Sequence, residues 1–227
     1  MATPDEVMEH LRAVARPDQL AGMARYGMNT TNRLGVTVAE LRRIAKMTGK
    51  DHELALALWR TGVADARILA SMVDEPQAVT PVQMDAWVAD FDSWDVCDQV
   101  CMNLFDKTPL AWQKVREWAG REEEFVKRAA FALIAALAWH DKQADDAAFC
   151  ALLPVIVAGA ADERNYVKKA VSWALRHIGK RNAALYAAAL ATAQELAALN
   201  ARSARWIARE TVKDLNSVAA QRRRHQS

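Results

Sequence analysis

The sequence contains few of the residues that interrupt regular structure or cross-link a chain. Its 227 residues include 8 Gly, 6 Pro and 3 Cys, whereas 52% of them are hydrophobic. So little Gly and Pro excludes a collagen-like or low-complexity chain, and the apolar fraction excludes an intrinsically disordered one. Three cysteines cannot all pair with one another. We therefore expect reduced thiols in a cytoplasmic protein.

Long apolar runs and familiar ligand motifs are also missing. Charged residues interrupt every stretch that approaches the roughly 20 apolar residues of a membrane-spanning helix, and the N-terminal residues predict no secretory signal. The five histidines show no zinc-ligand spacing, and no Gly-rich phosphate-binding loop is present. We expect no membrane partner and no metal.

Charge is nearly balanced over the whole chain but not along it. The net charge is +2; residues 1–120 carry 13 Lys and Arg against 17 Asp and Glu, and residues 121–227 carry 17 against 11. A basic half can attract an anionic polymer even when the whole protein is close to neutral. The alternative is that these charges are solvated helix faces spread over the surface.

The pattern of apolar residues is helical throughout. Leu41, Ile44 and Ala45 follow the i, i+3, i+4 spacing of one helix face, and no convincing alternation of polar and apolar residues predicts a strand. Asp51 and Thr80, the latter followed by Pro, are typical N-caps. The sequence predicts an all-α protein.

An internal repeat indicates which all-α architecture to expect. Residues 125–134 align with residues 166–175, and weaker copies lie on either side. Recurrence at this period favours HEAT-like helical repeats, stacked into a curved α-solenoid with a concave basic groove, over a generic helical bundle. We expect one HEAT-like domain over residues 1–220 and a disordered basic tail over 221–227. The aligned copies make five positions equivalent: Arg67, Asp98, Arg128, Lys169 and Ser203.

This register predicts that unusual residues gather along one groove. Asp98 would lie beside Arg128 and Lys169, its equivalents in the neighbouring repeats. Trp94 lies one helical turn before Asp98, and Trp173 lies one turn after Lys169. Cations suit phosphates and aromatic rings suit bases, although either tryptophan taken alone is more typical of a core. Asp95 is a rival carboxylate, but it lies about 100° around the helix from Trp94. The expected DNA-binding residues are Arg128, Lys127, Lys168, Lys169, Arg176, Lys180 and Arg205.

Three segments carry a family resemblance. Residues 93–98, 125–130 and 167–176 resemble the bacterial AlkD-type alkylpurine DNA glycosylases, as does the Leu34-Gly35-Val36 turn with the residues that follow it. The resemblance covers roughly residues 20 to 215 and implies hydrolysis of N3- or N7-alkylated purines in duplex DNA without a cofactor. It also implies a catalytic role for Asp98, with Trp94 and Trp173 as groove tryptophans and Arg128 as a groove arginine. Residues 26–32 depart from the family pattern.

A second function stays open at this point. The same residues are compatible with a non-catalytic HEAT-like module that binds DNA structures or a protein partner. A carboxylate centred among cations and aromatic rings favours the glycosylase, because a scaffold has no need of it. We expect a monomer that is cytoplasmic and associates with the nucleoid when bound to DNA.

Overall fold

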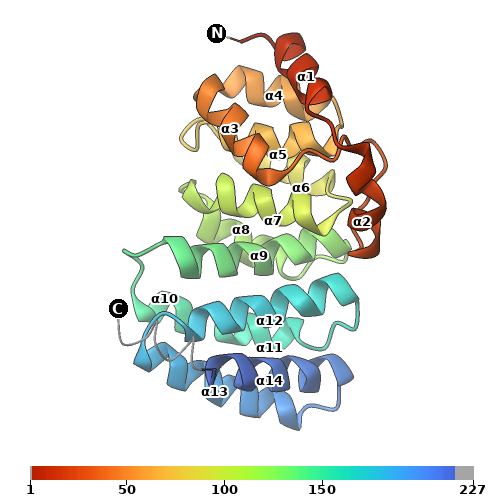
Figure 1. Ribbon diagram of the computed structural model, residues 1–227. Coiled ribbons are helices and arrows are strands. Elements are labelled where there is room, and N and C mark those ends of the chain that lie inside the picture. The colour runs from red at the N-terminus through yellow and green to blue at the C-terminus, as the bar shows by residue number, and fades with distance from the viewer. Residues whose placement is uncertain (1, 218–227) are drawn as a thin grey trace. The chain divides into compact units, whose positions relative to one another are not determined.

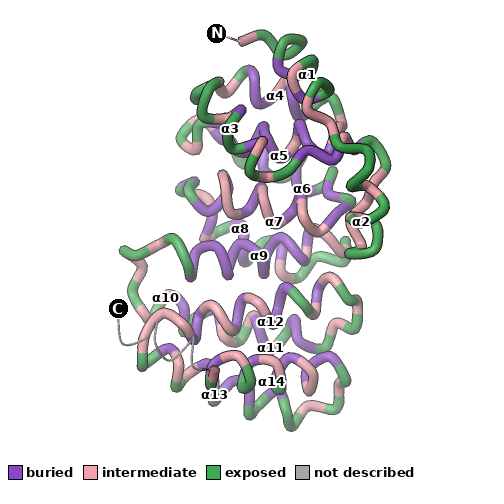
Figure 2. The backbone as a smooth tube through the Cα atoms, viewed as in Figure 1, coloured by how far each residue is buried: buried purple, intermediate pink, exposed green. Residues whose placement is uncertain are grey.

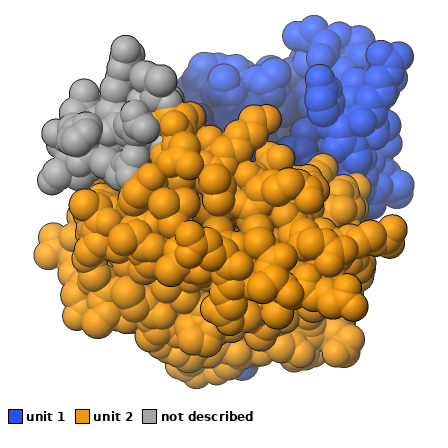
Figure 3. All heavy atoms as spheres, turned by 90° about the horizontal axis from the view of Figure 1, so that it is seen from below, with its two compact units in different colours: residues 1–110 blue, residues 111–227 orange. Residues whose placement is uncertain are grey.

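The computed structural model describes residues 2–217, and within that range every regular element is a helix. The all-α prediction is therefore confirmed. The chain divides into two compact units, residues 1–110 and 111–227, which are coloured separately in Figure 3. The basic tail predicted over residues 221–227 lies outside the described residues.

The first unit consists of short helices joined by tight turns (Figure 1). Helix α5 packs against α3 and α4, and α7 packs against α5. Short 3-10 turns at Pro17–Gln19 and Phe105–Lys107 complete the unit. The helices are α1 (Pro4–Ala13), α2 (Leu20–Arg25), α3 (Val38–Thr48), α4 (His52–Arg60), α5 (Ala64–Val73), α6 (Pro81–Ala89) and α7 (Trp94–Asn103).

Side-chain caps set where several of these helices begin. The Asp51 carboxylate accepts a hydrogen bond from the backbone N–H of Leu54, and the Thr80 hydroxyl accepts one from Gln83. Each bond satisfies an N–H group that has no partner within the helix. Both predicted N-caps are confirmed. The core beside them contains a stacked pair, Trp59 and Trp87, with ring centroids 3.9 Å apart.

The second unit is built around two long helices. Helix α12 packs along α9 and also contacts α13 and α14. Helix α9 is buried over most of its length, as Figure 2 shows. Gly159 allows a neighbouring helix to approach it, because an added Cβ would lie 2.3 Å from Cζ of Phe131. The helices are α8 (Ala111–Trp118), α9 (Glu124–His140), α10 (Asp146–Cys150), α11 (Leu153–Gly159), α12 (Asn165–Gly179), α13 (Ala183–Ala198) and α14 (Arg202–Leu215).

The helix boundaries match the repeat register inferred from the sequence. Asp98, Arg128 and Lys169 each lie four residues after the first residue of their helices, which are α7, α9 and α12. Arg67 lies three residues into α5, whereas Ser203 lies only one residue into α14. The register is therefore tightest in the three helices that carry the predicted site.

Candidate nucleic-acid interface

The proposed catalytic carboxylate lies on α7 of the first unit. Asp98 is half-buried, and Trp94, also half-buried, is the first residue of the same helix. The thiol of Cys101 on the next turn is fully buried, and this burial raises its pKa well above its ordinary value, with the negative charge of Asp98 adding to the rise. A thiol held protonated in this way is a poor nucleophile. The buried thiol therefore does not compete with the Asp98 carboxylate as the proposed reactive group.

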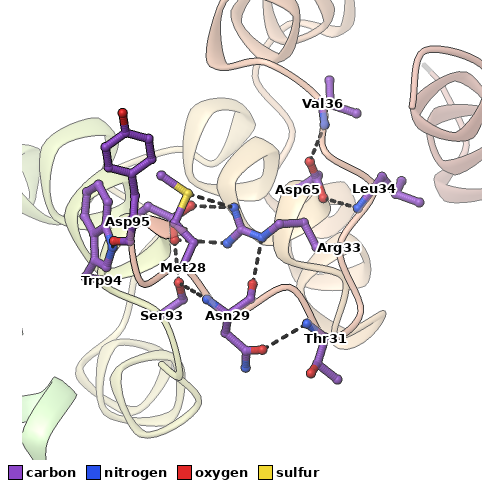
Figure 4. A network of polar contacts seen from close by, with 11 residues as sticks. Met28, Asn29, Thr31, Arg33, Leu34, Val36, Asp65, Ser93, Trp94 and Asp95 are labelled. Atoms are coloured by element: carbon purple, nitrogen blue, oxygen red, sulfur yellow. Dashed lines mark hydrogen bonds and ion pairs between the residues drawn. The ribbon is translucent and has the colours of Figure 1, made fainter. Parts of the chain in front are cut away.

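The rival carboxylate, Asp95, is committed to a buried ion pair. Both guanidinium Nη atoms of Arg33 donate to its oxygens, at 2.6 and 3.0 Å, and the Arg33 side chain is only 3% exposed. The Ser93 hydroxyl donates to the same carboxylate at 2.5 Å. Figure 4 shows these contacts converging at the start of α7. Asp95 therefore has a structural partner for each oxygen.

The loop before α3 is anchored to the same helix start. Nε of Arg33 donates to the Asn29 carbonyl at 2.9 Å, and the backbone N–H of Asn29 donates to the Ser93 hydroxyl at 3.0 Å. Farther along the loop, the backbone N–H groups of Leu34 and Val36 donate hydrogen bonds to the buried carboxylate of Asp65 on α5 (Figure 4). These bonds give partners to backbone groups of a loop that has little regular structure in which to pair them.

That anchored loop positions the Trp94 ring. The indole Nε1 of Trp94 donates to the backbone carbonyl of Tyr26 at 3.1 Å. The Tyr26 side chain itself is 79% exposed. Orientation of the Trp94 ring thus depends on a residue 68 positions earlier in the chain. Sequence reasoning missed Arg33 and Tyr26 as parts of this arrangement.

In the second unit, α12 brings several predicted DNA-binding residues onto one side of a helix. Lys169 is exposed, whereas Trp173 and Arg176 are half-buried. Nε of Arg176 donates to the carbonyl of Ser172 at 3.1 Å. Nζ of Lys168 lies 5.6 Å from the centroid of the Trp206 ring, within cation–π range. This helix supplies both cations and rings.

Other predicted cations are already engaged within the second unit. Lys127 forms an ion pair with Asp162 at 3.1 Å, and Lys180 forms one with Asp214. Arg205 donates to the carbonyl of Leu199 at 3.2 Å. Because an ion pair neutralises part of the cation's charge, Lys127 and Lys180 are weaker candidates for phosphate contact than Lys169.

Arg128 differs from the other cations in its burial. It is only 5% exposed, and its Nη1 donates to the carbonyl of Tyr166 at 2.6 Å. This bond ties α9 to the start of α12, where Tyr166 stacks on Phe125 with ring centroids 5.5 Å apart. Arg128 therefore has a packing role, and its contact with a phosphate stays a prediction, as does the placement of all these residues along one groove.

Two features are absent from the described part of the chain. No helix there is long and apolar enough to cross a membrane. No group of three or more His, Cys, Asp or Glu side chains among residues 2–217 is arranged to hold a metal ion.

Comparison with known proteins identifies the type of fold. Residues 7–215 match the sequence family described as DNA alkylation repair enzyme. The chain superposes on one solved structure with a TM-score of 0.78. That structure is of a protein from a family related to the HEAT-like repeat DNA glycosylases, with affinity for branched DNA structures. It is 18% identical, and the match covers 93% of this chain and 95% of that one. No curated protein matches the sequence. The predicted HEAT-like repeat fold is confirmed.

Proposed function

Because the chain belongs to the DNA alkylation repair enzyme family, we propose that it hydrolyses the N-glycosidic bond of N3- or N7-alkylated purines in duplex DNA. The observation that carries this proposal is the arrangement on α7. Asp98 lies one turn after an anchored Trp94, while the neighbouring Asp95 is occupied by Arg33. A carboxylate beside a fixed aromatic ring suits the stabilisation of a cationic sugar.

The reaction needs little help at the leaving group. An N3- or N7-alkylpurine already carries a positive charge, so the electron pair of the glycosidic bond leaves with the purine and neutralises it. The sugar passes through an oxocarbenium-like transition state, as in other glycoside cleavages. Water then adds its oxygen to C1′ and loses a proton. Atoms and charge balance without a cofactor.

In this scheme Asp98 acts on the sugar and on the water. Its negative charge stabilises the developing oxocarbenium ion, and it accepts the proton that the attacking water loses. Trp94 presents an electron-rich ring to the same charge, a cation–π interaction worth about 0.5–2 kcal/mol. We assign Trp173 the corresponding role from the second unit.

The cations of the second unit are assigned to the DNA backbone. Lys169 is best suited to a phosphate because it is exposed, and Arg176 lies on the same helix. Phosphate contacts fix the register of a protein on DNA without reading its sequence. Arg128, Lys127, Lys168, Lys180 and Arg205 are assigned to the same surface as secondary contributors. The protein is proposed to act as a monomer.

A second candidate function is DNA binding without catalysis. The structurally similar protein belongs to a family with affinity for branched DNA structures. Binding of this chain to a branched junction would use the same cations and rings, with Asp98 having no chemical role. The two candidates differ in one product, the free base.

Incubation with methylated DNA separates the candidates. The substrate is a duplex containing 7-methylguanine, with an otherwise identical unmodified duplex as control, and free base is measured by chromatography. We expect time-dependent release of 7-methylguanine and none of guanine. Tight binding to a four-way junction with no base released from any methylated duplex would favour the non-catalytic function.

A further inference from the structure

The second unit exposes a large aromatic side chain that the proposed function does not use. Trp139 lies at the C-terminal end of α9 and is 51% exposed, although the eight residues before it, 131–138, are all buried. Tryptophan buries more apolar surface than any other residue type when it gains a partner, and it is enriched at binding sites. An exposed tryptophan at the end of a buried helix therefore requires an explanation.

Trp139 is the outer member of a continuous series of rings. Its centroid lies 5.8 Å from that of His177, and the His177 centroid lies 5.7 Å from that of Trp173. We call Trp139, His177 and Trp173 the aromatic row. It crosses from α9 to α12, so it is formed by packing and not by one helix face. His140 flanks it, 5.3 Å from Trp139.

The charges beside the aromatic row favour an anionic ligand. Lys169 and Arg176 lie four residues before and three after Trp173, on the same side of α12. The acidic residue nearest in sequence to Trp139 is Asp141. Its carboxylate accepts hydrogen bonds from the Trp112 indole at 3.3 Å and from two backbone N–H groups. Its charge is thus partly compensated within the fold.

The rings of the row are inclined to one another, by 54° between Trp139 and His177 and by 85° between His177 and Trp173. We propose that Trp139, the exposed end of the aromatic row, stacks an unpaired nucleotide of DNA whose phosphates contact Lys169 and Arg176. Paired bases hide their faces in the duplex stack, whereas an unpaired base offers its whole face to an aromatic ring. Rings combined with cations are the usual construction of single-strand binding sites. The inference rests on the proposed function for its DNA partner. It adds a site for single-stranded DNA adjoining a duplex.

Fluorescence anisotropy with two labelled DNAs tests this site. One is a blunt duplex, and the other is the same duplex carrying a short single-stranded tail. We expect the native protein to bind the tailed DNA roughly tenfold more tightly, the effect of stacking one base. Trp139→Leu should reduce that preference to less than about threefold. It should leave the affinity for the blunt duplex within about twofold.

Two further variants control for loss of exposed apolar surface and for folding. Trp139→Phe keeps a ring and should retain most of the preference for the tail. Val82→Ala removes apolar surface at another highly exposed position, 77% exposed on α6, and should change neither affinity. A tail preference that survives Trp139→Leu unchanged would overturn the aromatic row as a stacking site.

The outcomes also distinguish this site from the proposed function. Binding to the blunt duplex and release of 7-methylguanine, with no preference for the tail, would reject the aromatic row alone. A protein that binds neither DNA would reject both proposals. Equal losses on both DNAs in Trp139→Leu would show that Trp139 supports the fold or the duplex contact, which also overturns the inference.

Discussion

The start of α7 in the first unit and the aromatic row with its cations in the second are built differently. Around α7, the side chains are buried and paired: Arg33 and Asp95 form a bidentate ion pair, and Ser93 completes it. Along α9 and α12, Trp139 and Lys169 are exposed. One region holds its side chains in a single arrangement, and the other leaves them accessible to solvent.

This difference corresponds to the two tasks in the proposed reaction. A catalytic carboxylate and its neighbouring ring must be held within a fraction of an ångström, which requires supporting contacts around them. A surface that follows a DNA backbone needs charge and accessible rings more than it needs one fixed geometry. Changes in buried contacts of the first unit are therefore expected to alter stability and base release. Changes in exposed charge of the second unit are expected to alter DNA affinity.

The largest effect is expected from breaking the buried ion pair. Arg33→Ala leaves the Asp95 carboxylate without its cation in a site where both side chains are little exposed, 3% and 12%. We expect a loss of about 3–5 kcal/mol in the free energy of unfolding, measured by urea denaturation. Base release should fall with it, since the loop that holds Trp94 is anchored by the same arginine.

The matched control is an exposed pair in the same unit. Arg43 pairs with Glu40 on α3, and its side chain is 53% exposed. Arg43→Ala should change the free energy of unfolding far less than Arg33→Ala, because water and salt screen such exposed pairs. Equal losses in Arg33→Ala and Arg43→Ala would contradict the view that the start of α7 is rigidly supported.

An intermediate effect is expected from removing an exposed cation of α12. Lys169→Ala should lower affinity for duplex DNA several-fold at low salt. It should also reduce the slope of log affinity against log salt by about one. Lys127→Ala should have a smaller effect, because Lys127 already pairs with Asp162. Salt titrations of both variants measure the difference. A larger effect at Lys127 would reverse the assignment of the backbone contacts.

The smallest effect concerns the carboxylate that engages Lys127. Hydrogen bonds from Arg164 lower the pKa of Asp162 from 3.8 to about 2, with Lys127 contributing. A lowered pKa stabilises the folded state above the unfolded value, and this stabilisation is lost as pH falls from about 4 to about 2. Asp162→Asn should therefore cost about 1 kcal/mol near pH 6 and much less near pH 2, by thermal unfolding. A cost that persists at pH 2 would show that packing is responsible.

The sequence predicted what depends on local patterns. Helix caps at Asp51 and Thr80 follow from capping chemistry within one helix. The equivalence of Asp98, Arg128 and Lys169 follows from aligning the repeated segments of the sequence. The choice of Asp98 over Asp95 also came from angles around a single helix. These features needed no knowledge of which segments meet in space.

Contacts between distant segments could not be predicted in this way. Arg33 and Asp95 are 62 residues apart, and the loop before α3 includes Asn32 in a left-handed conformation at φ 55°. No periodic rule indicates which carboxylate such an arginine will meet. The exposure of Trp139 was hidden for a similar reason, since it follows a run of apolar residues that are all buried.

The central claim is that Asp98 performs the chemistry, and one measurement tests it directly. Single-turnover release of 7-methylguanine from duplex DNA is compared for the native protein, Asp98→Asn and Glu53→Gln, which alters an exposed carboxylate on α4. We predict that Asp98→Asn slows release at least about 100-fold, as for the loss of one main electrostatic stabiliser, with DNA affinity within about threefold. Glu53→Gln should release the base at the native rate. Release by Asp98→Asn at the native rate would contradict the account.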